Sequence, residues 1–106
     1  MTRITSSVYK DAYVIRAEGH ATGSVEACAA ISALLQALAQ WTFRKGYRED
    51  QVLEPGHACV VLPRDLGGSR AVWELITDAL ETICEDEENF SEMYRDVGQE
   101  TKKYLI

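Results

Sequence analysis

The chain has 106 residues, of which 46% are hydrophobic and 26% are charged, and its formal net charge is −6. This length predicts a single domain spanning 1–106 with enough apolar residues for a core, although a domain this small buries only ~60–65% of its unfolded surface. The acidic balance argues against direct nucleic-acid binding, which normally needs a basic surface. No stretch reaches the ~18 apolar residues of a membrane-spanning helix.

The three cysteines have no paired spacing, and neither a CxxC nor a CxxH pattern occurs. The sequence therefore predicts no metal site and no cofactor. The first residues also lack the apolar stretch of a secretory leader. Together these features predict a cytoplasmic protein whose thiols stay free.

The first part of the chain predicts a β-hairpin. Apolar and polar residues alternate over 3–9 and again over 12–18, and Lys10 and Asp11 supply a polar turn between the two strands.

A long helix is predicted next, from Val25 to Arg44, because apolar residues recur there at helical spacing. Ser24 can cap this helix by accepting an amide hydrogen of its first turn. Glu26 lies favourably near the positive end of the helix, and Gly46 can end it.

The second half repeats the pattern. Residues 49–54 and 57–62 predict another hairpin, whose turn Glu54-Pro55-Gly56 places a glycine where a positive φ is often needed. The second of these strands is almost entirely apolar, which is typical of a central strand covered on both faces. Ser69 can cap a second long helix over 70–87.

The tail beyond Asn89 has a weaker pattern, which predicts either one more helical turn or a short edge strand near 104–106. The whole order predicts an α+β domain. Its sheet is small, mostly antiparallel and four-stranded, in ββα–ββα order with two long helices.

Cys28 and His20 form the candidate catalytic pair. A thiol is a good nucleophile as the thiolate, and Cys28 lies about one turn inside the predicted helix, where free amides and the helix dipole favour negative charge. His20 is separated from it by seven residues that include a glycine, so the connection can fold back and bring the imidazole near the sulfur. Amides at the same helix start can hold an oxyanion. A cysteine in an apolar helix is more often a packing residue, so the pair alone leaves both interpretations open.

Ser32 follows Cys28 by four residues and lies on the same helix face. It can orient His20 or bind the substrate, or it can simply donate to the carbonyl one turn earlier.

The run Gly19-His20-Ala21, followed by Cys28-Ala29-Ala30-Ile31-Ser32-Ala33-Leu34, resembles the signature of the ribosomal-processing cysteine proteases, the Prp family. The order of elements is similar over nearly the whole chain, including the Glu54-Pro55-Gly56 turn, while the specific motif residues lie in the first part. The resemblance places the family's nucleophile on Cys28 and its histidine on His20. Gly19, Gly23, Ser24 and Ser32 are then expected to support the site or bind substrate.

What the resemblance implies is a small cytoplasmic cysteine protease, usually a homodimer, with a protein or peptide as its substrate. The best-known family substrate is a large-subunit ribosomal protein with a short N-terminal extension, and phage members act on capsid-type proteins. The resemblance therefore implies an endopeptidase that removes a short N-terminal extension from a basic protein of this kind. The net acidity of the chain suits a basic substrate.

The connection between His20 and Cys28 departs from the family pattern. It is shorter, and it lacks the Gly-x-Asp pair, although Glu26 precedes Cys28 by two residues. The short connection suits a divergent, phage-type member. It also motivates an alternative, a non-catalytic protein-interaction module of the same fold. A third hypothesis is another thiol-dependent acyl hydrolase, which would act on small esters.

The other reactive or aromatic residues favour structural roles. His57 and Cys59 alternate on one strand and point the same way without facing each other, so surface and core roles are expected. Cys84 lies near the apolar stripe of the second helix and is predicted to pack there. Trp41 and Trp73 occupy stripe positions and are expected in the core or in a dimer interface.

Overall fold

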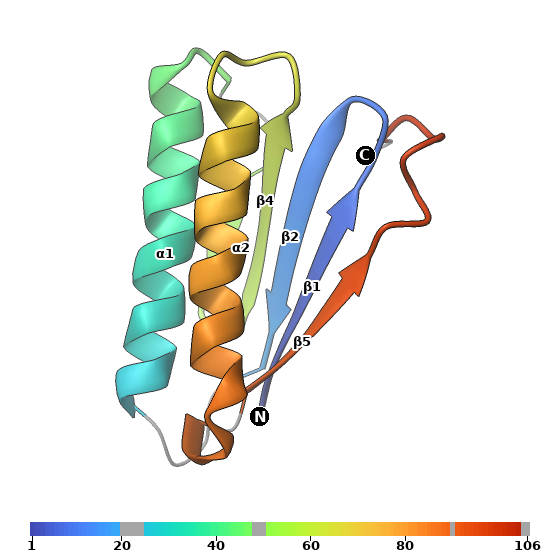
Figure 1. The fold of residues 1–106 in the computed structure, drawn as a ribbon. Helices are drawn as coiled ribbons and strands as arrows, with labels where there is room; N and C mark the ends of the chain where they lie inside the picture. The colour runs from blue at the N-terminus through green and yellow to red at the C-terminus, as the bar shows by residue number, and fades with distance from the viewer. Residues whose placement is uncertain (20–24, 48–50, 90, 105–106) are drawn as a thin grey trace.

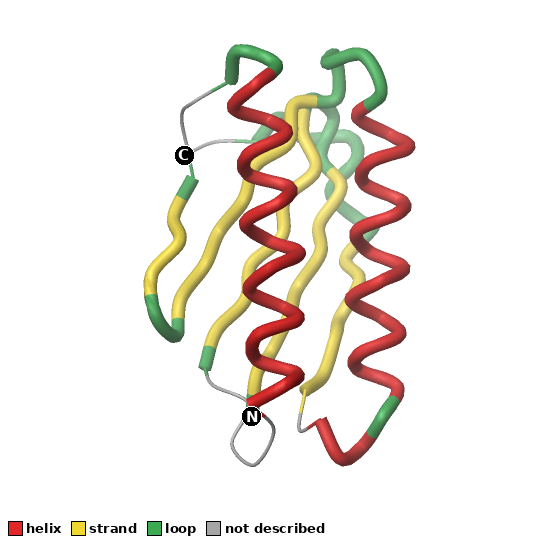
Figure 2. The backbone as a smooth tube through the Cα atoms, turned by 90° about the vertical axis from the view of Figure 1, so that its left-hand side faces the viewer, coloured by secondary structure: helices red, strands yellow, loops and turns green. Residues whose placement is uncertain are grey.

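Two layers build the domain in the computed structural model: one sheet and a pair of helices that lie side by side on one of its faces (Figures 1 and 2). The structure describes residues 1–19, 25–47, 51–89 and 91–104. The elements in chain order are β1 (Thr2–Val8), β2 (Ala12–Glu18), α1 (Val25–Arg44), β3 (Val52–Glu54), β4 (His57–Pro63), α2 (Ser69–Glu85), the 3-10 helix η1 (Glu87–Asn89) and β5 (Ser91–Asp96).

The sheet has five strands in the order β3-β4-β2-β1-β5, so the predicted four-stranded sheet is wrong by one strand. The three pairings within the first four strands are antiparallel, as predicted, whereas β5 runs parallel to β1. The extra strand is the predicted weak tail. It lies at Ser91–Asp96, where the sequence offered one more helical turn as an alternative to an edge strand near 104–106. Residues 105–106 lie outside the described residues.

The core lies between the helices and the facing side of β1, β2 and β4. Alternate strand residues point into it, and the apolar stripes of α1 and α2 cover them. Trp73 of α2 stacks on Tyr13 of β2 with ring centroids 4.8 Å apart. The most deeply buried members are Ile4, Ile15, Leu38, Val60, Leu62 and Leu80.

A smaller apolar cluster covers part of the other face of the sheet. Ala12, Val14 and Val61 are buried there, and Tyr47 and Tyr104 pack against them. This second cluster explains why β4 is apolar on both faces, as expected for a central strand.

Most element bounds agree with the sequence prediction, and the first helix agrees at both ends. The third strand is shorter than predicted, since the described part of it begins at Val52; residues 48–50 lie outside the described residues. Gln51 does not continue the strand. Instead its side-chain amide donates to the Val61 carbonyl at 2.8 Å and accepts from the Val61 N–H at 3.1 Å.

The predicted cap of the second helix is wrong. Gly68, with φ of +85°, occupies the N-cap position, and no side chain caps the helix there. Ser69 is the first helical residue, and its hydroxyl donates to the Arg64 carbonyl at 2.9 Å, so it holds the preceding turn instead. The predicted cap of the first helix, Ser24, lies outside the described residues. Neither described helix combines the length and apolarity that a membrane span requires.

Candidate functional site

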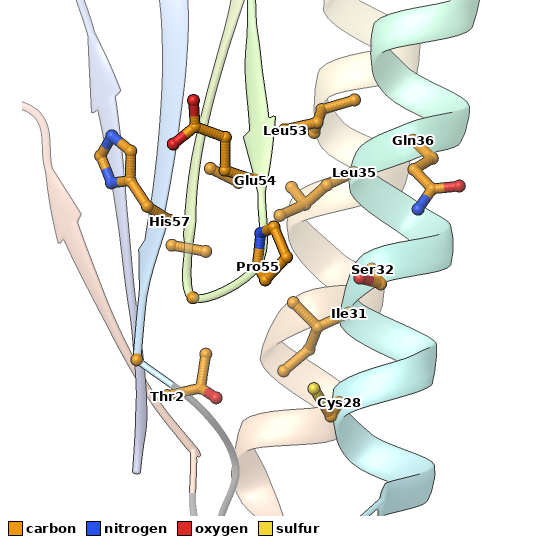
Figure 3. Close-up of a pocket in the computed structure, with 14 residues that line it drawn as sticks. Thr2, Cys28, Ile31, Ser32, Leu35, Gln36, Leu53, Glu54, Pro55 and His57 are labelled. Atoms are coloured by element: carbon orange, nitrogen blue, oxygen red, sulfur yellow. The ribbon is translucent and has the colours of Figure 1, made fainter.

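A cleft of about 360 Å³ opens between the first half of α1 and the β3–β4 hairpin (Figure 3). Cys28 lies in its wall, half-buried, and its thiol projects from the helix toward the space beside the hairpin. The cleft is lined by residues 2, 17, 19, 28, 31, 32, 35, 36 and 53–58.

The helix places Cys28 where the sequence predicted it, as the fourth residue of α1. The amides of this first turn have no carbonyl partner within the helix, so they and the helix dipole favour an anion beside the sulfur. Ile31 and Leu35 follow on the buried side of the helix and extend the wall of the cleft from the thiol. The arrangement therefore combines a thiol near a helix start with an apolar surface able to hold part of an extended chain.

Gly19 joins two other parts of the cleft through its backbone. Its N–H donates to the Gly56 carbonyl at 2.9 Å, which ties the end of β2 to the β3–β4 turn. Its φ is +87°, and a Cβ atom at this position would lie 2.5 Å from the Met1 carbonyl oxygen. Both the backbone conformation and the close approach require glycine here. Gly56 has φ of +76°, as predicted for the glycine of its turn.

His57, the histidine on the β3–β4 hairpin, does not lie next to the Cys28 thiol. The imidazole of His57 points away from α1 in Figure 3, and its Nδ1 atom lies 3.9 Å from Glu18 Oε1. Both side chains are largely exposed, so this contact is a weak surface pair. Cys59 packs against the small cluster on the other face of the sheet. The structure thus gives these two residues the surface and core roles expected from the sequence.

Of the predicted site residues, the structure brings Cys28, Ser32 and Gly19 to the same cleft, and Ser32 is exposed at its edge. His20, Gly23 and Ser24 lie outside the described residues, so the contact between His20 and Cys28 stays a prediction.

The hairpin residues of the cleft were missed as site residues by sequence reasoning. Leu53 and Pro55 face α1 across the opening (Figure 3). The Glu54-Pro55-Gly56 motif marked a turn, but a turn motif does not say which helix it will face.

The remaining thiol and the tryptophans are structural. Burial raises the pKa of the Cys84 thiol, and the nearby Glu81 and Glu92 carboxylates add to the rise. An elevated pKa lowers the thiolate fraction and makes Cys84 a poor nucleophile. Trp73 is buried in the core, and Trp41 packs at its edge. Within the described ranges, no group of three or more His, Cys, Asp or Glu side chains could hold a metal ion.

Comparison with known proteins identifies the fold. The structure superposes on the ribosomal processing protease Prp from S. aureus, solved in complex with a covalently linked product peptide, with a TM-score of 0.68 and 17% identity over 91% of this chain and 100% of that one. The same protease in complex with a substrate peptide gives the same values. SMU.848 from Streptococcus mutans gives a TM-score of 0.66 at 17% identity, covering 92% of this chain and 95% of the other.

No family model matches the chain, and no curated protein matches it in sequence. The class defined by fold is therefore a small α+β domain with the architecture of a processing protease. The particular fold is that of the ribosomal processing protease Prp, so the resemblance to this family is confirmed at the level of the fold.

Proposed function

We propose that the chain is a cysteine endopeptidase of the Prp type, with Cys28 as nucleophile and His20 as general base. The observation that carries the proposal is the position of Cys28 in the first turn of α1, in the wall of a cleft of about 360 Å³. The fold supports it, since a protease with this fold has been solved with both a substrate peptide and a covalently linked product peptide.

The chemistry would follow acyl transfer. His20 removes the thiol proton, and the Cys28 sulfur attacks the carbonyl carbon of the scissile peptide bond. Amides of the first turn of α1 stabilise the resulting oxyanion. His20 then returns the proton to the leaving amine, and water hydrolyses the thioester to free the acid and the thiol. In this proposal Ser32 orients the imidazole or binds the substrate, and Gly19 supports the site through its hydrogen bond to the Gly56 carbonyl of the hairpin turn.

The substrate class follows from the resemblance and from charge. The proposed substrate is a short N-terminal extension of a basic protein, such as a large-subunit ribosomal protein or a phage capsid-type protein. Among the described residues that line the cleft, Glu54 is acidic and none is a lysine or arginine. Glu26 stands at the start of α1, and Glu18 ends β2 nearby. This local acidity, within a chain of net charge −6, favours the approach of a cationic segment.

A second candidate is a non-catalytic protein-interaction module of the same fold. The feature that favours it is the short connection between His20 and Cys28, which departs from the family pattern. In this case the cleft would hold a peptide without cutting it. A cytoplasmic location and a homodimeric state are further predictions from the sequence.

Cleavage by single-cysteine variants tests the proposal. Cys28→Ala should abolish cleavage of a basic protein that carries such an N-terminal extension, a loss of at least about 10³-fold. Cys59→Ala and Cys84→Ala, the matched controls, should keep near-normal rates because neither thiol lies in the cleft. Undiminished cleavage by Cys28→Ala would remove this cysteine from the mechanism.

Thiol reactivity separates the protease from the interaction module. In a chain carrying Cys59→Ser and Cys84→Ser, alkylation of Cys28 by iodoacetamide should be faster than that of a model thiol below about pH 8. Replacing His20 with Ala should slow it. Alkylation that follows an ordinary thiol at every pH would favour the module.

A further inference from the structure

A second pocket lies at the end of the domain opposite to the Cys28 cleft. Four segments meet there: the turn between β1 and β2, the end of α1 with the residues after it, the connection from β4 to α2, and the C-terminal tail (upper end of Figure 1). Its volume of about 830 Å³ lies within the ~300–1,000 Å³ of typical small-molecule sites. We call it the distal pocket; it is lined by residues 10–12, 45–47, 61, 63–66, 103 and 104.

Hydrogen bonds hold the C-terminal tail in the wall of the distal pocket. The Lys10 N–H donates to the Lys102 carbonyl at 2.7 Å, and the Tyr104 N–H donates to Asp11 Oδ1 at 2.8 Å. The Tyr104 ring also meets the Tyr9 ring edge-on, with centroids 5.2 Å apart. The tail and the β1–β2 turn therefore form one connected wall of the pocket.

The charge of the distal pocket is opposite to that of the chain. Its lining contains four cationic side chains and two carboxylates, a net charge of +2, whereas the whole chain carries −6. None of the four cations forms an ion pair with a carboxylate of the described residues, although Arg3, Arg70 and Arg95 elsewhere all do. An anionic ligand would give these cations a partner. The four cations are Lys10, Lys45, Arg64 and Lys103.

Two of these cations are held in place by contacts that leave their charge without a counter-charge. The Arg64 guanidinium donates to the Tyr9 carbonyl at 2.7 Å and lies over the Tyr13 ring, 5.1 Å from its centroid. The Lys45 ammonium lies over the Trp41 ring, 5.3 Å from its centroid. Such contacts orient a positive charge and keep it able to attract an anion.

The remaining lining suits a flat ring and a sugar beside the anion. Ala12 and Val61 are its buried, apolar part, and the half-buried rings of Tyr47 and Tyr104 pack against the same cluster. Aromatic surface of this kind stacks on nucleobases. Asp65 is exposed and can accept hydrogen bonds from sugar hydroxyls, as carboxylates do in nucleotide sites.

We propose that the distal pocket binds a free nucleoside phosphate, with Lys10 and Lys103 on the phosphates. Asp65 then accepts from the sugar hydroxyls, and the base lies against the ring of Tyr47 or Tyr104. An acidic peptide would also satisfy the lysines, but it offers Asp65 a second carboxylate in place of a hydroxyl. A nucleic-acid strand would extend beyond the pocket over a chain of net charge −6, which repels it. The proposal does not depend on the cleft, which lies at the other end of the domain.

Calorimetric titration with ADP tests this site. The wild-type chain should bind ADP with a dissociation constant below about 1 mM. Lys103→Glu should raise that constant at least about tenfold, because it replaces a charge-assisted contact by a repulsion. Lys102→Glu is the matched control: it makes the same change of charge in the same exposed segment, but the Lys102 side chain does not line the pocket. A wild-type constant above about 1 mM, or equal losses in both variants, would overturn the proposal.

Fragments of the ligand separate a nucleotide from other anions. ADP should bind at least about tenfold more tightly than pyrophosphate or adenosine, since it makes the contacts of both. Pyrophosphate binding as tight as that of ADP would show an adventitious ion only and would overturn the assignment. Asp65→Ala should reduce the preference for ADP over pyrophosphate, a ratio in which the change of charge cancels. An unchanged preference would refute the contact with the sugar.

Two larger anions test the choice of ligand. A hexaadenylate strand and a tetraglutamate peptide should each bind less tightly than ADP, because the strand is repelled by the chain and the peptide by Asp65. Tighter binding of either one would overturn the proposal. Because the readout is the heat of binding and not cleavage, the result is independent of the proposed protease activity.

Discussion

Replacement of Gly19 by alanine should destabilise the domain more than the same replacement at Gly46 or Gly68, which also have positive φ but no backbone atom so close. An L-residue in the left-handed region costs about 1–2 kcal/mol, which is partly offset by the lower entropy of the unfolded alanine chain. The added Cβ atom would also lie 2.5 Å from the Met1 carbonyl oxygen, so the start of β1 must move. The expected loss is about 2–4 kcal/mol, a large fraction of the ~5–15 kcal/mol that stabilises a typical domain.

Gly46→Ala is the matched control for this substitution. Gly46 has φ of +97°, close to that of Gly19, but no atom of the described residues other than its chain neighbours lies within 4 Å of the position where its Cβ atom would be. It should therefore lose only the backbone contribution, about 1 kcal/mol. Urea denaturation of both variants gives the two free energies of unfolding. Both chains carry a short N-terminal extension, so that Met1 and its carbonyl group are not removed. Equal losses would refute the role of the contact with Met1.

Three further predictions concern the core, the β4 edge and the β1–β5 pair. Trp73→Ala should lower the free energy of unfolding by about 3–5 kcal/mol, because it removes a buried, stacked ring; a loss under 1 kcal/mol in urea denaturation would contradict that burial. Gln51→Ala should cost about 1–3 kcal/mol by leaving both backbone groups of Val61 without the amide. Gln51→Glu can still accept from the Val61 N–H, so it should cost less than Gln51→Ala. Equal stability of the wild type, Gln51→Ala and Gln51→Glu would argue against the pairing of Gln51 with Val61. The hydrogen bond from Arg3 holds the pKa of Glu92 below its usual value. The stability that this pair contributes is therefore present above the unfolded pKa of about 4.3 and is lost as the pH falls through the lower folded value. Arg3→Ala should raise the pKa of Glu92 in an NMR titration, and an unchanged titration would show that the pair is not formed in solution.

The helices could be predicted well because their pattern is local. The apolar stripe of α1 repeats every three to four residues, and both of its ends agree with the prediction. By contrast, β5 could not be predicted from its own residues. It is an edge strand that pairs with β1 at the other end of the chain, with Ser91 opposite Thr2, and such a pairing leaves little trace in the sequence of the strand itself.

The errors at element ends have local physical reasons. Ser69 fits the pattern of a cap, but its hydroxyl donates to the Arg64 carbonyl, and Gly68 takes the cap position. Gln51 lies within the predicted strand, but its side chain replaces the backbone in pairing with β4. Ser and Gln side chains compete with the backbone for hydrogen bonds, and which of the two forms depends on tertiary neighbours.

The candidate site could be predicted in part. The start of a helix and the motif residues of the resemblance placed Cys28 in the first turn of α1, where the structure has it. The opposite wall could not be predicted, because it depends on how the β3–β4 hairpin packs beside α1. Gly19 is an example. Its motif was recognised in the sequence, but its close approach to Met1 and its hydrogen bond to the Gly56 carbonyl depend on how the end of β2, the start of the chain and the β3–β4 turn come together in the fold.

The frame of this site depends mainly on backbone geometry. The positive φ of Gly19, its hydrogen bond to the Gly56 carbonyl and the backbone amides at the start of α1 do not depend on the side chains around them. Such a frame can persist while the surrounding sequence changes, in keeping with a TM-score of 0.68 at 17% identity. The Cys28 thiol is different, because a single substitution would remove its chemistry and leave the fold intact. Its reactivity, rather than the architecture around it, is therefore the property that separates a protease from a peptide-binding module of the same shape.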